Sequence, residues 1–150
     1  MATQMPTGAR AIGAVTFMVV GWLIANAYVA NMPFDEAVGY FRELTGLIGL
    51  FTGWSLMGSS TGHGYIAAVG TGWRTLIVVI FWALLGFAIW DMLITSTKMR
   101  YNDPMEALVD VFAIMLDRSQ VLVSVDCLIV FFVGGAIAGM LTESAARRWP

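Results

Sequence analysis

The sequence predicts an all-α membrane protein, in which four transmembrane helices form a bundle and one additional amphipathic helix lies at the membrane interface. Of the 150 residues, 59% are hydrophobic and 12% are charged, and the mean hydropathy is +0.78, well outside the averages of soluble domains. Four apolar stretches approach the roughly 20 residues needed to cross about 30 Å of hydrocarbon. A fifth stretch combines helix-start residues with acidic and apolar side chains at helical spacing. We therefore expect residues 1–150 to form a single integral membrane domain.

The first two expected spans lie in the first third of the chain. One covers about residues 11–30 and contains no charged residue. Arg10 precedes it and residues 25–27 resemble a processing site, and these two features suggest a cleaved signal peptide. That reading is the less favoured alternative to a span. The second span covers about residues 40–57, with Arg42 near its beginning.

The third and fourth expected spans have charged residues near their ends. The third covers about residues 66–95, because Arg74 and Asp91 flank its uncharged centre and can extend their charged ends toward the membrane surface. The fourth covers about residues 120–144, with Asp126 near its start.

Between these two spans, the sequence contains the start of another helix. Asp103 is a good N-cap residue, Pro104 suits the first helical position because no N–H is needed there, and Glu106 is favourable in the positive first turn. A helix over about residues 104–117 is too short to cross the bilayer. We expect it to lie roughly parallel to the membrane plane.

This expected interfacial helix has two different faces. Its apolar residues are Leu108, Val109, Phe112, Met115 and Leu116. Its acidic residues are Glu106, Asp110 and Asp117. The apolar face is expected to turn toward the interface or the bundle. The acidic face then either seals the bundle toward water or provides a docking face for a partner.

The orientation in the membrane follows from the loops. An even number of spans places both termini on one side. Lys and Arg are divided equally between the two sides, so the positive-inside rule does not decide the orientation. Of the ten acidic residues, Glu143 alone lies on the terminal side. We therefore expect both termini in the cytoplasm and the region around residues 104–117 outside.

Small residues four positions apart predict close helix packing, since helices in lipid associate by close contact at such residues. The second span contains Thr45, Gly49 and Gly53, and the fourth contains Gly135 and Gly139. We interpret them as contacts within the bundle, with a homodimer face as the less favoured alternative.

Charged side chains in a membrane are costly unless they are paired or hydrated. We expect Arg74 to pair with Glu143, and Arg42 to pair with Asp91 or Asp126. A proton or ion route is less favoured, because no span carries an acidic residue or a histidine near its middle.

No motif in the sequence predicts a catalytic site, a metal site or a cofactor. The glycine-rich loop around His63 lacks the Lys-Ser/Thr ending of a P-loop. With one histidine and one cysteine, Cys127, a zinc site is improbable. The net charge of −2 and the lack of a basic run argue against nucleic-acid binding.

Five segments, GLIGLFTGWSLMG, GHGYIAAVGTGWRT, VIFWALLGF, STKMRYNDPMEAL and ARRWP, together closely resemble the TrgA family of small bacterial membrane proteins associated with tellurium resistance. The resemblance extends over nearly the whole chain. It implies an inner-membrane protein with several spans and a role in tellurite tolerance. It carries no catalytic or binding residue over to this sequence.

Three classes of function remain open at this point. The first is a non-enzymatic membrane protein that contributes to tellurite tolerance, by transport or by protecting the envelope. The second is an accessory or assembly subunit of a larger respiratory or photosynthetic membrane complex, bound through the acidic helix. The third, a membrane enzyme, is the least favoured, because no constellation of catalytic residues can be argued.

Overall fold

The computed structural model of the protein describes residues 7–32, 39–98 and 102–149. Within these ranges it contains helices and no strand, which confirms the all-α prediction. In chain order the elements are α1 (Thr7–Ala30), α2 (Phe41–Thr52), the π-helix η1 (Gly53–Met57), α3 (Tyr65–Thr97), α4 (Pro104–Val121) and α5 (Val125–Arg148).

Three helices in the described part of the chain are long and apolar enough to cross a membrane. They cover Gly8–Ala30, Tyr65–Thr97 and Val125–Arg148. This agrees with a multi-pass membrane protein. The second expected span is divided into α2, which has 12 residues, and the five-residue η1 that continues it.

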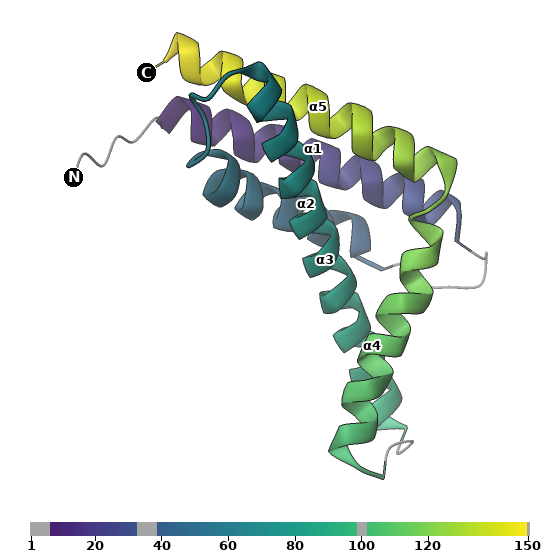
Figure 1. Ribbon diagram of the computed structural model, residues 1–150. Helices are drawn as coiled ribbons and strands as arrows, with labels where there is room; N and C mark the ends of the chain where they lie inside the picture. The colour runs from purple at the N-terminus through teal and green to yellow at the C-terminus, as the bar shows by residue number, and fades with distance from the viewer. Residues whose placement is uncertain (1–6, 33–38, 99–101, 150) are drawn as a thin grey trace.

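Helix α1 runs antiparallel to α2 and η1, and their backbones come very close together (Figure 1). A Cβ atom added at Gly21 would lie 3.0 Å from the carbonyl oxygen of Thr45, near the beginning of α2. One added at Gly53, at the start of η1, would lie 2.5 Å from the carbonyl oxygen of Gly13. At Gly53 only glycine permits the helices to come this close, because Cβ atoms in proteins rarely come within 3.0 Å of such a neighbour.

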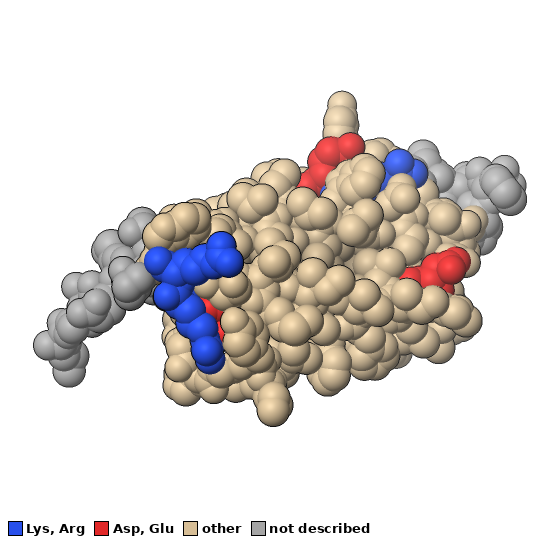
Figure 2. Space-filling model, turned by 90° about the horizontal axis from the view of Figure 1, so that it is seen from above, with Lys and Arg blue, Asp and Glu red and all other residues tan. Residues whose placement is uncertain are grey.

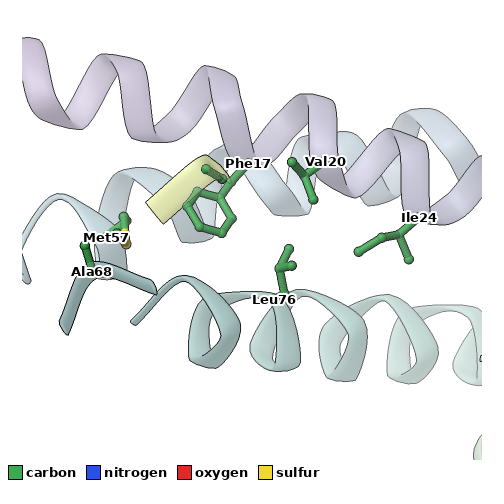
Figure 3. Close-up of a cluster of buried hydrophobic side chains, with 7 residues drawn as sticks. Phe17, Val20, Ile24, Met57, Ala68 and Leu76 are labelled. Carbon is green, nitrogen blue, oxygen red and sulfur yellow. The ribbon is translucent and has the colours of Figure 1, made fainter. Parts of the chain in front are cut away.

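Helix α5 lies along another side of α1, also antiparallel to it (Figure 1). Gly134 faces Val20, and Thr142 faces Gly13 nearer the chain ends. Between α1, η1, α3 and α5 lies a core of buried residues, most of which Figure 3 shows: Phe17, Val20, Ile24, Met57, Ala68, Leu76 and Ala138.

Helix α3 packs on α5 over its first part and then leaves the bundle (Figure 1). Helix α4 returns beside the distal part of α3, and the two form a projecting hairpin. The fourth span was expected from about residue 120, but α5 begins at Val125. The reason is that α4 continues to Val121, and a short turn that includes Ser124 separates the two helices.

Candidate functional site

At the end of the bundle near the chain termini, Glu143 holds the loop between η1 and α3. Its side chain is only 1% exposed. The backbone N–H of Gly62 donates to Oε2 over 2.9 Å, and that of Gly64 donates to Oε1 over 3.1 Å. Both glycines have a φ of +98°, a conformation that other residues rarely adopt. This loop conformation lets both amides meet one carboxylate.

Arg147 completes this arrangement, which we call the Glu143 clamp. Its Nε donates to Glu143 Oε1 over 3.3 Å, one helical turn along α5. Its guanidinium lies 4.6 Å from the centre of the Tyr65 ring, at the first residue of α3. The clamp therefore connects α5, the loop and the start of α3.

Figure 2 shows basic side chains gathered at one end of the molecule, with a largely uncharged surface between the two ends.

The expected pairing of Arg74 with Glu143 is not found. Glu143 is occupied by the two loop amides and Arg147. Arg74 is exposed on α3 and has no ion-pair or hydrogen-bond partner among the described residues. The reason is the rotation of α3, which packs on α5 through Gly72 and leaves the opposite side, with Arg74, outside.

A second group of polar contacts holds α3 and α4 together in the hairpin and joins the hairpin to α1. Arg118 Nη2 lies 2.8 Å from Asp91 Oδ2, and its guanidinium lies 5.2 Å from the centre of the Phe87 ring. The hydroxyl of Tyr28 in α1 donates to the carbonyl oxygen of Arg118 over 3.3 Å. Sequence reasoning missed Arg118 as a partner. Its position in the last turn of an amphipathic helix was the available signal.

The expected pairs of Arg42 with Asp91 or Asp126 are also not found among the described residues. Asp91 binds Arg118 instead. Asp126 accepts a hydrogen bond of 3.4 Å from the side-chain amide of Asn31.

The small residues singled out in the sequence all lie in contacts between helices. Thr45, Gly49 and Gly53 are buried on the side of α2 and η1 that faces α1. Gly139 lies against the backbone of Ala68 in α3, and Gly135 lies against the side chains of α3.

Helix α4 contacts α3 through a different face from the one that the sequence indicated. Val111 is its one buried residue, at 7% exposed, whereas Leu108, Phe112 and Leu116 are 57%, 58% and 70% exposed. Of the two expected positions of the apolar face, the bundle is therefore not the one found, and contact of this face with the membrane interface stays a prediction. The contacting face is centred one residue away, and one residue corresponds to about 100° of helix rotation.

The acidic residues of α4 lie on its outer surface to different degrees. Glu106 and Asp117 are exposed, and Asp110 is half-buried. Asp103 makes no side-chain capping bond, although α4 begins at Pro104 directly after it. Glu106 instead accepts a hydrogen bond of 3.4 Å from the backbone N–H of Asn102.

A groove of about 400 Å³ lies between α2 and the distal part of α3. Its walls are mostly apolar and aromatic, and Asp91 is the charged residue among them. The groove can accept an apolar molecule, but it contains no pair of groups suited to proton transfer or nucleophilic attack. Among the described residues, no group of three or more His, Cys, Asp and Glu side chains could hold a metal ion.

Comparisons of the chain with protein-family models, with curated proteins and with solved structures found no match.

Proposed function

We propose that the chain is a non-enzymatic, multi-pass protein of the bacterial inner membrane that acts as an accessory subunit of a larger membrane complex. The observation that carries this proposal is the surface of α4. This helix packs against α3 through one face, on which Val111 is the buried residue. Its apolar stripe and two of its acidic residues remain uncovered on a projecting hairpin.

The proposed role of α4 is that of an interfacial docking helix. Its 18 residues are about 27 Å long at 1.5 Å per residue, and with its acidic residues it is unsuited to crossing the bilayer. The exposed Leu108, Phe112 and Leu116 suit the boundary between headgroups and acyl chains, or the apolar surface of a partner. Glu106 and Asp117 are then available to basic groups of that partner.

The proposed topology has four spans, with α2 and η1 together as the second. Their combined range Phe41–Met57 is about 26 Å long at 1.5 Å per residue, close to the lower limit for a span. It runs antiparallel along α1, which is itself long enough to cross. In the proposed orientation, both termini lie in the cytoplasm and α4 lies at the outer face.

A contribution to tellurite tolerance is the second candidate function, and the resemblance to the TrgA family favours it. The two candidates are separable. Deletion of the gene tests tolerance by growth on tellurite, whereas purification in a mild detergent tests for a stoichiometric complex. An isolated monomer or homodimer together with a tellurite phenotype would favour this second function.

The first prediction concerns orientation. Alkaline phosphatase fused after Asn102 is expected to be active, and the same enzyme fused after Trp149 is expected to be inactive, because it requires export. Green fluorescent protein at the same two positions should give the opposite pattern. Active phosphatase at Trp149 would reverse the proposed orientation.

The second prediction concerns the acidic surface of α4. In the variant Glu106→Gln with Asp117→Asn, we expect at least tenfold less partner to co-purify, while the amount of inserted protein is unchanged. The amides keep the shape of the side chains and remove their charge. The measurement is the ratio of partner to chain after purification in a mild detergent, determined by quantitative mass spectrometry.

A matched control is Glu43→Gln, which removes an exposed charge from α2 instead of α4. It should leave the ratio at the wild-type value. Equal loss of the partner in both variants would assign the effect to overall charge, and unchanged binding in the double variant would remove α4's acids from the docking surface.

A further inference from the structure

Arg74 is a charged residue on the outside of a membrane-spanning helix with no partner among the described residues. It is exposed, and no described acidic group pairs with it. The opposite face of α3 is the buried one, formed by Ala68, Gly72, Thr75, Leu76 and Val79. The guanidinium therefore points away from the bundle rather than into it.

The contacts of its neighbours show the level at which Arg74 lies. The indole N–H of Trp73 donates to the carbonyl oxygen of Phe132 in α5 over 3.1 Å. Gly72 lies against the backbone of Gly135, near the middle of α5. Arg74 is therefore level with the middle part of α5, more than two helical turns beyond Tyr65 at the start of α3.

An arginine at this level needs a partner. Its guanidinium remains charged and has five N–H donors, and hydrocarbon offers no acceptor for them. Arg74, Ile77 and Phe81 are all exposed. The side of α3 that carries Arg74 is thus open to whatever surrounds the protein.

The surface around Arg74 is suited to another helix. Ala67 and Gly70 lie on the same face toward the start of α3, and a Cβ atom added at Gly70 would meet nothing within 4 Å. Ile77 and Phe81, which are 59% and 51% exposed, continue the face on the other side of Arg74. Small residues let a second helix come close, and apolar residues pack against it.

A second copy of this chain cannot supply the missing acid. A dimer with its twofold axis along the membrane normal keeps every residue at its own depth. Glu143 is buried in its clamp near one end of α5, and Asp91 pairs with Arg118 toward the other end of α3. The remaining acidic residues that the structure describes lie in the first turns of α2 and α5, at the N-cap of α4 or in α4.

From these observations we infer that Arg74 binds a carboxylate in a transmembrane helix of a different protein, which packs along Ala67, Gly70, Ile77 and Phe81. The inference rests on the proposed function in one respect, namely that a partner subunit exists. It does not depend on α4, which forms a separate surface.

The test uses the full chain in its native membrane, with a photoreactive amino acid at Ile77 or, separately, at Met105 in α4. We expect the probe at Ile77 to cross-link to a membrane protein whose cross-linked helix contains Asp or Glu. Arg74→Leu should reduce this cross-link at least tenfold and leave insertion and the Met105 cross-link unchanged. Arg148→Leu, at an exposed arginine near the end of α5, is the matched control and should have no effect.

Two further variants make the test specific for a charge pair. Gly70→Leu blocks the approach of a helix without touching the core, so it should also abolish the Ile77 cross-link. Exchanging the charges, with Arg74→Glu in this chain and an arginine at the partner's acid, should restore a cross-link that either change alone removes.

The outcomes separate the two proposals. A cross-link at Met105 together with only lipid adducts at Ile77 would overturn the inference and leave the proposed function intact. No protein cross-link at either position would overturn both. A protein cross-link at Ile77 that survives Arg74→Leu, or whose helix has no acidic residue, would also overturn the inference.

Discussion

Replacing Gly49 with alanine is expected to cause the largest loss of stability of any single methyl addition in α2. A Cβ atom at this position would lie well within the van der Waals contact distance of the Phe17 carbonyl oxygen in α1. The carbonyl belongs to the backbone and the Cβ is held rigidly by it, so the two helices must move apart. We expect the free energy of unfolding to fall by about 3 kcal/mol, as for an overpacked core. Reversible unfolding in mixed detergent micelles measures this change.

The matched control is Gly86→Ala in α3. Its added Cβ meets nothing within 4 Å, and alanine is a better helix former than glycine. We expect stability to remain unchanged or to rise by about 0.5–1 kcal/mol. A similar loss in both variants would show that the effect arises from the substitution of a helical glycine and not from the contact between α1 and α2.

Replacing Glu143 with alanine is expected to have the second-largest effect. The change removes the acceptor of two backbone N–H groups and one guanidinium from a buried position. Hydrogen bonds to a charged group contribute about 1.5–3 kcal/mol each, but the partly exposed loop amides can recover some of this from water. We expect a loss of about 2–3 kcal/mol, measured by the same unfolding assay. Faster proteolysis within residues 58–64 should accompany it.

Two controls define the origin of this effect. Glu43→Ala removes an exposed carboxylate from α2 and should change stability by less than about 0.5 kcal/mol. Glu143→Gln keeps one acceptor oxygen but loses the charge, and its stability should lie between those of the wild type and of Glu143→Ala. A protected loop in Glu143→Ala would contradict the proposed role of the clamp.

The sequence by itself determined the class of the protein and most of its helices. Long apolar runs predict spans because hydrocarbon forces the backbone to satisfy its hydrogen bonds within a helix. These runs correspond to α1, α3 and α5. The start of α4 at Pro104 was also predictable, since proline at the first helical position is a local signal. Its end at Val121 was not, because no strong stop signal follows residue 117.

Only the tertiary structure decided which groups meet. The acceptor role of Glu143 was not visible in the sequence, because two of its three donors are backbone amides, which every residue except proline carries. Arg74 and Glu143 were expected to pair because both were expected near the same membrane face. Arg74 instead lies level with the middle of α5, and its side chain points away from α5, since the shift and rotation of a helix against its neighbours depend on long-range packing.

The same physical reason explains α4. Its two faces could be recognised from spacing, but the face that contacts α3 is turned by about one residue from the most apolar one. The contact is fixed by Val111 and by the pairing of Arg118 with Asp91, residues far apart in the sequence. Local pattern thus determined that this segment is an amphipathic helix, and long-range packing decided which of its side chains remain available to a partner.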